Sequence, residues 1–585
     1  MAMRLNRRAG VSLLALFIIS GAVFTSPSQS AENIIDPNQG WVVPGETTGV
    51  GSQNAYFGER SSNDRDYSAL IDQSKLGNDQ LDPTCASLDD PKCSTTQNFI
   101  YYAQIPVCKV ATDTNCIEAV NATDASGKVY PGSFMRYFPD IAQNQYVGSP
   151  SLNLPSGGGA SLFTIPGAEG PAGNTYFVSF SMSGNISKGG SARLGSVHAR
   201  IIPVQLQSQQ YSFPYCKSEN KLCNTGINKL SFDGSTYRWG ESGSGGLACA
   251  DNSVGENLCA QKQAYPADFR FALKVRLSTA PSGWMHGRMV NPEIAIEKSG
   301  GNNLLTVAAN PIGVPSIYKH YKWVDMPAKL KEHYDPVTGK YYDPATGKFI
   351  NGGEGWSSGA WTTAPSPYSS SAIDELNLWL PYVNDIATVV PQYWSFRSLT
   401  QQELEGANKC FTDATQLNGI VTTNATAYSP GPPVFDKNAG DLNYRVAAPH
   451  FVANGVDTVK GTYDLVMRSE VARCIYGFSK APINASISII SKDGSPQIAT
   501  TVVSEKLGWL YLTAKNFEFS SPTVKVKMQQ EQAAPTPTPT PTQSASDAPV
   551  QQIVAKKTSI TCVKGKVSKK VVAVNPTCPK GYKKK

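Results

Sequence analysis

The sequence predicts a mainly β protein with two sandwich domains of the immunoglobulin-like or jelly-roll type. Several segments alternate apolar and polar residues with a period of two, which is typical of strands with one buried and one solvated face. The 585 residues include 50 glycines and 40 prolines, which favours strands and turns over long helices. Twelve cysteines lie mostly in close pairs, as in exported domains that disulfide bonds hold together.

The first 30 residues predict a secretory signal peptide. Three arginines precede an apolar run over residues 11–24, and small residues follow up to Ala31. The run has 14 residues, fewer than the roughly 20 that a membrane-spanning helix needs. We therefore expect cleavage near residues 28–31 and a secreted protein, with an uncleaved N-terminal anchor as the alternative. The next residues, 31–80, are polar and predict a loop-rich segment.

Cysteine spacing predicts six intramolecular disulfide bonds. An even count in an exported chain is typical of a disulfide framework, although neighbouring pairs can also cross. No spacing matches a CxxC motif and no histidines cluster beside the cysteines, so we expect no metal site and no cofactor. The expected pairs are Cys85 with Cys93, Cys108 with Cys116, Cys216 with Cys223, Cys249 with Cys259, Cys410 with Cys474 and Cys562 with Cys578.

Residues 81–324 are predicted to form the first, disulfide-linked β domain. Strands are expected over residues 174–187 and 196–207. The alternation is clearest over residues 269–277, where every second residue is apolar. Turn residues recur between these segments, which favours a sandwich.

Residues 325–390 are predicted to form an aromatic-rich connector with short helices. Helix signals follow Asp325 and recur over residues 371–380, where Pro381 ends the pattern. Between them, residues 334–348 hold two copies of the pattern Tyr-Asp-Pro-x-Thr-Gly-Lys, and each copy is typical of a turn.

Residues 391–530 are predicted to form the second β sandwich. Apolar and alternating segments over residues 463–478 and 508–521 indicate strands. Turn residues separate such segments at similar intervals, as in immunoglobulin-like folds.

A short helix and a long-range disulfide bond are expected at the start of this second domain. Thr400 and Glu403 have the spacing of a capping box, and Gly406 is typical of a helix end. Cys410 would then connect the start of the domain to a central strand at Cys474.

The C-terminal residues predict a spacer followed by a small basic hairpin. Residues 531–549 are rich in Thr-Pro repeats, which hold a chain in extended polyproline II geometry. Residues 550–585 hold ten lysines and no acidic side chain, so the body of this +7 chain is itself mildly acidic. A disulfide is expected to close the hairpin, because so few residues cannot build a core alone. The predicted polyanion-binding residues are Lys564, Lys566, Lys569, Lys570, Lys580, Lys583, Lys584 and Lys585.

Two parts of the chain resemble an exported protein family of actinobacteria, notably of freshwater lineages. The ending "ITCVKGKVSKKVVAVNPTCPKGYKKK" is similar to a tail that recurs on their secreted proteins. The segments "YRVAAPHF" and "KGTYDLVMRSEVARCIYGFSKAP" resemble the body of such proteins. No activity is established for this family, so the resemblance implies no catalytic residue. It implies a Gram-positive cell surface or its surroundings.

No motif predicts a catalytic centre. The chain has five histidines, and no two of them have the spacing of metal ligands. His286 is therefore interpreted as a structural residue. Glu293 and Glu297 lie four residues apart on a predicted strand, which places them on one solvated face rather than in a glycosidase pair. The segment "GESGSGG" lacks the spacing of a nucleophile elbow. A non-enzymatic protein is favoured.

Nine aromatic residues gather between Tyr318 and Trp361. On loops, such rings stack on sugar faces, whereas in the alternative interpretation they seal the junction between two β domains. The candidates for glycan stacking are Trp323, Tyr341, Tyr342, Trp356 and Trp361.

These observations favour an exported cell-surface protein of structural, adhesion or binding type, retained at an anionic envelope by its basic tail. The expected partners are anionic envelope polymers or lipid headgroups, because lysine attracts polyanions as a point charge, without specific recognition of nucleic acid. The first alternative is a carbohydrate-binding or carbohydrate-active secreted protein that uses residues 318–361. The second is a secreted hydrolase whose residues meet only in the folded chain. The ligand and the oligomeric state stay open.

Overall fold

The computed structural model contains two compact units, Met1–Glu531 and Gln532–Lys585. Of the described residues, 53% lie in strands and 10% in helices, so the predicted mainly β fold is confirmed. The described residues are 52–59, 68–76, 83–138, 146–208, 230–232, 237–239, 249–253, 256, 258–322, 325–333, 361–363, 365–479, 483–497, 499–519, 522–530, 558–565, 567–573 and 576–585.

Several predicted segments lie outside the described residues. They are the signal peptide, the turn repeats at 334–348 and the linker at 531–549. Within the described part of the chain, no helix has both the length and the apolar character needed to span a membrane.

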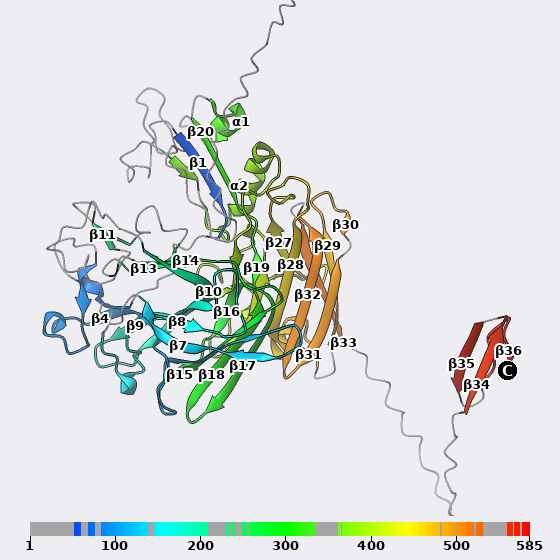
Figure 1. Cartoon of the computed structure of the whole chain (residues 1–585), viewed down its shortest axis with the longest axis horizontal. Coiled ribbons are helices and arrows are strands. Elements are labelled where there is room, and N and C mark those ends of the chain that lie inside the picture. Colours follow the sequence, from blue (N-terminus) through cyan, green and yellow to red (C-terminus); the bar gives the residue numbers. More distant parts are fainter. Residues whose placement is uncertain are drawn as a thin grey trace, which may run out of the picture. The chain divides into compact units, whose positions relative to one another are not determined.

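A sheet of fifteen strands runs through the larger unit (Figure 1). Its main path, in spatial order, is β3 (Thr84–Cys85), β2 (Ala69–Asp72), β4 (Asn98–Gln104), β9 (Thr175–Ser187), β10 (Arg193–Ser208), β23 (Ser395–Ser398), β16 (Gly283–Arg288), β24 (Leu417–Thr423), β28 (Lys460–Arg468), β32 (Trp509–Glu518) and β31 (Thr500–Lys506). Beside this path lie β7 (Ser133–Phe138), β8 (Ala160–Thr164), β13 (Cys249–Ser253) and β14 (Leu258–Lys262). The pairing is antiparallel except between β16 and β24, which run parallel.

Two further sheets accompany this central sheet. The five-stranded sheet has the order β17 (Val290–Ser299), β18 (Asn302–Asn310), β15 (Arg270–Leu277), β5 (Cys116–Thr123) and β6 (Val129–Pro131). The six-stranded sheet has the order β25 (Ala427–Tyr428), β27 (Asp441–Ala447), β33 (Thr523–Gln530), β29 (Ile483–Ile490) and β30 (Pro496–Gln497), with β26 (Val434–Asp436) beside β27.

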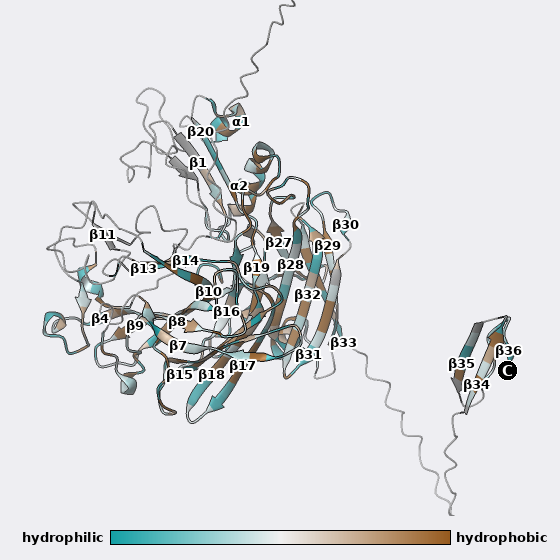
Figure 2. Ribbon diagram, viewed as in Figure 1, coloured by the Kyte–Doolittle hydropathy of each residue, from teal (hydrophilic) through white to brown (hydrophobic). Residues whose placement is uncertain are grey.

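The inner strands of the central sheet are covered on both faces. Val466 of β28 packs into the core shared with the five-stranded sheet, whereas Leu465 packs into the core shared with the six-stranded sheet. In β32, Tyr511 packs against the core shared with the five-stranded sheet, and Leu512 packs into the core shared with the six-stranded sheet. Because successive side chains of a strand point to opposite faces, the body has three β layers at these strands. Hydrophobic residues, brown in Figure 2, recur along the strands of the body.

Burial on both faces explains the sequence of β24. All residues of β24 are buried. Because neither face of the strand contacts solvent, its sequence contains no charged residue and no alternation of apolar and polar residues. Gly419 is required there, because an added Cβ would lie 2.6 Å from the ring of Trp284 and from the carbonyl oxygen of Val466.

The structure differs from the expectation of two separate sandwiches over 81–324 and 391–530. The central sheet takes β10 and β16 from the first segment and places β23, from the second segment, between them. Residues 325–390 therefore do not separate two β domains, and the whole of Met1–Glu531 forms one compact unit.

Smaller sheets and short helices complete the larger unit. Strand β1 (Ser52–Phe57) lies between β20 (Ile317–Lys322) and β21 (Trp361–Thr363), and β19 (Ile312–Gly313) pairs with β22 (Gln392–Tyr393). A separate pair is formed by β11 (Leu230–Phe232) and β12 (Tyr237–Trp239). The helices are α1 (Ala328–His333), α2 (Ala372–Trp379) and α3 (Ser469–Tyr476), with 3-10 turns at Gln73–Lys75, Pro91–Cys93, Pro150–Leu152, Leu380–Val383 and Lys409–Phe411.

Two of the three helix predictions are confirmed and the third is wrong. Helices form after Asp325 and over Ala372–Trp379, as expected. The capping-box bonds between Thr400 and Glu403 also form, but a series of turns follows instead of a helix. The strand expected over residues 463–478 ends early and continues as α3, as described next.

Helix α3 shows why the strand prediction fails. Val471, Ala472 and Ile475 are buried at helical spacing. Gly477 then ends the helix with a φ of 67°, a left-handed conformation that favours glycine. Cys474 therefore lies on a helix rather than on the expected central strand.

Four of the predicted disulfide bonds are confirmed. They are Cys85–Cys93, Cys108–Cys116, Cys410–Cys474 and Cys562–Cys578. Cys259 is also disulfide-bonded. Cys216, Cys223 and the side chain of Cys249 lie outside what the structure describes.

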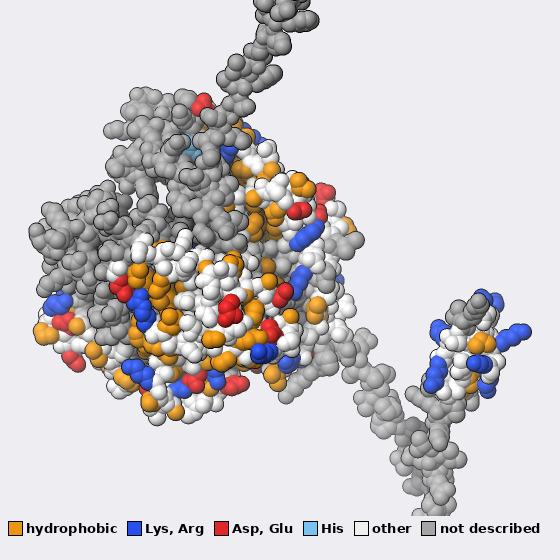
Figure 3. Space-filling model, in the orientation of Figure 1, with side chains coloured by type: hydrophobic (Ala, Val, Ile, Leu, Met, Phe, Trp, Pro, Cys, Tyr) orange, Lys and Arg blue, Asp and Glu red, His pale blue; other side chains and the backbone are white. Residues whose placement is uncertain are grey.

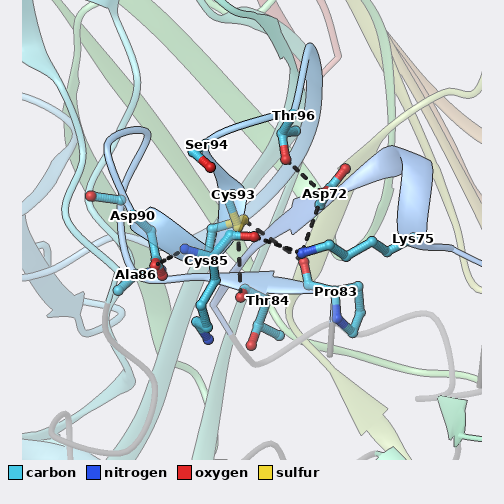
Figure 4. The surroundings of a disulfide bond; sticks show 12 residues. Asp72, Lys75, Pro83, Thr84, Cys85, Ala86, Asp90, Cys93, Ser94 and Thr96 are labelled. Carbon is cyan, nitrogen blue, oxygen red and sulfur yellow. Dashed lines mark hydrogen bonds and ion pairs between the residues drawn. A yellow bond between two sulfur atoms is a disulfide. The ribbon is translucent and has the colours of Figure 1, made fainter. Parts of the chain in front are cut away.

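Figure 4 shows how polar residues support the first of these bonds. The Cys85–Cys93 disulfide joins β3 to the 3-10 turn Pro91–Cys93. Asp90 accepts hydrogen bonds from the backbone nitrogens of Ala86 and Lys92 at 2.7 and 2.9 Å. These bonds lower the pKa of Asp90 and fix the loop that the disulfide closes.

The described residues of the smaller unit form a three-stranded sheet instead of the expected two-stranded hairpin. Strand β34 (Thr558–Lys564) lies between β35 (Val567–Ala573) and β36 (Lys583–Lys584). The predicted pairing of the first two strands and the Cys562–Cys578 bond are confirmed.

Candidate functional site

The tail sheet is the first candidate site, because it places lysines on both faces. Cys562 of β34 lies opposite Lys569 on one side and Lys584 on the other. Residues directly opposite each other in antiparallel strands point to the same face. Lys569 and Lys584 therefore flank the disulfide-bonded Cys562.

The second face of the tail sheet carries a matching pair of lysines. Lys570 lies opposite Thr561, and Lys583 lies opposite Val563. Thr561 and Val563 are the chain neighbours of Cys562, so their side chains point away from it. The sheet therefore presents cationic groups in opposite directions.

No acidic side chain offsets these charges within the tail. Residues 551–585 contain no Asp or Glu, and every described tail lysine is exposed, as Figure 3 shows for those on the visible side of the small unit. Lys566 lies outside the described residues. The side chain of Lys564 lies beside Gly581. A Cβ added to this glycine would be 3.5 Å from Lys564 Nζ. The described tail lysines form a compact display of ammonium groups, which lack the bidentate geometry of a guanidinium group.

The tail sheet depends on its covalent bond. Among the tail side chains that the structure describes, Cys562 alone is buried. So small a core contributes little hydrophobic stabilisation. The disulfide is therefore what keeps the lysines in a fixed arrangement.

His286, the most prominent histidine of the sequence, lies inside the larger unit. It sits on β16 and is 3% exposed. Its ring stacks on Tyr428 with a centroid distance of 4.0 Å and an interplanar angle of 3°. Burial and the positive charges of Arg288 and Arg397 lower its pKa well below the usual value. His286 is thus held neutral, in agreement with its interpretation as a structural residue.

Two buried ion pairs surround this histidine, and the sequence alone did not indicate them. Arg288 Nε donates to Glu59 Oε2 at 2.6 Å, and its Nη1 donates to the carbonyl oxygens of Thr423 and Ala425. The guanidinium also lies over the ring of Tyr428. This pair connects the end of β1 to β16.

The second ion pair connects a turn to the central sheet. Arg397 of β23 donates from Nη1 and Nη2 to the two carboxylate oxygens of Glu403, each at 2.8 Å. Its guanidinium lies 3.9 Å from the ring centre of Tyr368. Glu403 also accepts from the backbone nitrogen of Thr400. The capping-box spacing of Thr400 and Glu403 was the only sequence signal for this arrangement.

These contacts predict a specific acid sensitivity. The pKa of His286 is lower in the folded chain than in the unfolded chain, so the unfolded chain binds more protons as the pH falls below about 6.5. Folding stability should therefore decrease with acid. His286→Phe should reduce the slope of the unfolding free energy against pH by up to about 1.4 kcal/mol per pH unit.

Urea unfolding at a series of pH values measures this slope. Tyr428→Phe is the matched control, because it keeps the stacked ring and removes a hydroxyl that has no hydrogen-bond partner among the described residues. It should retain the acid slope of the wild type. An unchanged slope in His286→Phe would contradict the assignment.

Two acidic residues that the sequence places on one solvated face lie on the surface of the five-stranded sheet. Glu293 and Glu297 are exposed on β17, and Glu293 pairs with Arg270 at 3.4 Å. No group of three or more His, Cys, Asp or Glu within the described ranges has a geometry that could hold a metal ion.

The glycan-stacking candidates are mostly outside the described residues. Trp323, Tyr341, Tyr342 and Trp356 lie there, and Trp361 is placed by its backbone alone, in β21. Of the other aromatics in this region, Tyr318 is buried and Tyr321 packs beside Trp379 at 6.2 Å. These two rings serve packing, and the glycan hypothesis stays a prediction.

Comparison of the chain with protein-family models, curated proteins and solved structures finds no match. The resemblance to an exported actinobacterial family therefore stays a prediction, and the case for function rests on the residues themselves.

Proposed function

We propose that this is a non-enzymatic exported protein that its C-terminal unit retains at an anionic cell envelope. The observation that carries the proposal is the exposed set of tail lysines on both faces of a disulfide-closed sheet, without an acidic side chain nearby in sequence. The four disulfide bonds suggest an oxidising, extracellular location.

The chemistry of lysine defines the kind of partner. An ammonium group attracts phosphate and carboxylate as a point charge, and binding releases the counterions of the polyanion. Affinity should therefore fall steeply with salt. If all the described lysines make contact, the loss is on the order of 10³-fold between roughly 50 and 200 mM salt.

Co-sedimentation with Gram-positive wall fragments over a salt series tests this function. The full chain should sediment at low salt and be released at high salt, and a truncation to residues 1–549 should stay in the supernatant. A quadruple change of Lys569, Lys570, Lys583 and Lys584 to Gln should behave like the truncation. The same four positions changed to Arg should still sediment, because the charge is kept.

The proposal fails if the truncated protein sediments as firmly as the full chain, or if salt does not release the full chain. Fragments stripped of anionic polymers distinguish the two candidate partners. Retention on stripped fragments would point to lipid headgroups, and loss of retention would point to the polymers.

A further inference from the structure

A lysine and an asparagine meet on the exposed side of a buried carboxyl, where the central sheet adjoins the five-stranded sheet. Asp464 of β28 lies opposite Thr513 of β32, and Thr462 lies opposite Lys515. Asp464 and Lys515 are therefore diagonal neighbours on one face. That is the face of Val466, which packs into the core shared with the five-stranded sheet.

Asn291 reaches this pair from the five-stranded sheet. It is the second residue of β17 and has a φ of 55°. Its backbone nitrogen donates to Asp464 Oδ2 at 3.1 Å, and its carbonyl oxygen accepts from Arg270 Nη1 at 2.7 Å. The left-handed backbone of Asn291 is thus fixed on both sides by charged groups.

The amine of Lys515 lies directly against the carboxamide of Asn291. Lys515 Nζ is 2.5 Å from Asn291 Oδ1. Because a C=O bond is about 1.2 Å long, Nζ lies no more than about 3.7 Å from the carboxamide carbon. That limit is close to the roughly 3–3.5 Å separation at which bound groups react. The carboxamide nitrogen faces Asn310 Oδ1 at 3.4 Å on the exposed side of the residue.

Asp464 supplies a carboxyl with unusual surroundings. It is 1% exposed and accepts hydrogen bonds from the hydroxyls of Thr422 and Thr513 at 3.0 and 2.6 Å. Burial raises its pKa, and Lys515 is close enough to act on it electrostatically. Such a carboxyl can take up a proton and return it, which is what amide exchange requires.

We propose that Lys515 and Asn291 form an intramolecular isopeptide bond, with Asp464 transferring the protons. The Lys515 ammonium group first passes one proton to Asp464, and the freed lone pair of Nζ attacks the carboxamide carbon. Asp464 returns that proton to Nδ2, and the bond from the carbon to Nδ2 breaks. Asp464 then takes the second proton from Nζ and transfers it to the released ammonia. Overall, an ammonium group and a carboxamide become a secondary amide and an ammonium ion. No oxidant or cofactor is consumed.

The bond would join β32 of the central sheet to β17 of the five-stranded sheet. It would enclose the chain from residue 291 to residue 515, which also contains the Cys410–Cys474 disulfide. Two packed layers would then be connected by a link that reducing agents do not open. This inference does not rest on the function of the tail.

Peptide mapping of the full, exported protein after reduction and trypsin digestion tests the bond. We expect a branched peptide that contains both Asn291 and Lys515, about 17 Da lighter than the two linear peptides together because ammonia is lost. Trypsin does not cleave after a lysine whose amine is acylated. Linear peptides alone in the wild-type digest would overturn the proposal.

Variants assign the roles of the three residues. Lys515→Arg should give linear peptides only, whereas Lys460→Arg, a change at an exposed lysine of β28, should keep the branched peptide. Asp464→Asn should leave Asn291 and Lys515 unlinked in protein that remains folded by circular dichroism. If Asp464→Asn does not fold, wild-type protein that has been recovered before folding, with its linear peptides confirmed by mass spectrometry, is folded instead. The rate at which this protein releases ammonia, measured against pH, should follow one carboxyl titration. A branched peptide in folded Asp464→Asn, or a rate independent of pH, would remove Asp464 from the mechanism.

Discussion

Replacing Glu403 by alanine should lower the free energy of unfolding by about 3–5 kcal/mol. The Glu403 side chain is 4% exposed and forms a two-bond ion pair with Arg397. Removing the carboxylate leaves the Arg397 guanidinium buried without its counter-charge, and burying an unpaired charge is costly. Thr400 also loses the acceptor of its backbone nitrogen. Chemical denaturation monitored by tryptophan fluorescence measures the loss.

An exposed ion pair provides the control for this change. Arg445 and Asp374 are 57% and 75% exposed and lie 3.5 Å apart. Asp374→Ala should therefore change stability by no more than about 0.5 kcal/mol. The double change Arg397→Met with Glu403→Leu should recover much of the loss, because no charge then stays buried. Similar effects of Glu403→Ala and Asp374→Ala would show that the buried pair is not structural.

The second large effect is expected from the longest-range disulfide bond. Changing Cys410 and Cys474 to serine should destabilise the larger unit by about 4 kcal/mol, because the bond closes a long loop and restricts the unfolded chain. The two cysteines are 64 positions apart. They hold α3 against the turn that precedes β24. The measurement is the unfolding midpoint of the non-reduced protein.

The tail disulfide gives a matched comparison. Changing Cys562 and Cys578 to serine removes a bond of the separate C-terminal unit. It should leave the unfolding midpoint of Met1–Glu531 unchanged while the tail loses its protection from proteases. Equal shifts of the midpoint in both double variants would contradict the division into two units.

Local features of the fold were predictable from sequence because their causes lie within a few residues. The alternation over residues 269–277 became β15, and the apolar pattern that follows Ser371 became α2. Close cysteine spacing likewise predicted Cys85–Cys93 and the tail disulfide. The lysine display could be anticipated for the same reason, since it depends on one short segment.

Long-range pairing was not predictable from sequence. Strand β23 pairs with both β10 and β16, and nothing in its four residues indicates which partners they have. Glu59 and Arg288 are 229 positions apart, and their pairing depends on the position of β1 after folding. Asn291, Asp464 and Lys515 come from three strands in two sheets, so their meeting has no local signature. The strand prediction over residues 463–478 is confirmed up to Arg468 and wrong beyond it, because α3 has a helical apolar spacing.

The position of β23 has a consequence for how the protein is made. Strand β23, residues 395–398, lies between β10 and β16 and pairs with both of them. The sheet therefore stays incomplete at this point after β16, which ends at residue 288, has been synthesised. More than a hundred further residues must leave the ribosome before the N-terminal half can close its hydrogen-bond ladder. Contacts of such high sequence separation form slowly. Until then the nascent chain exposes the edges of β10 and β16 that β23 later covers, and unpaired strand edges are sites at which other chains can pair.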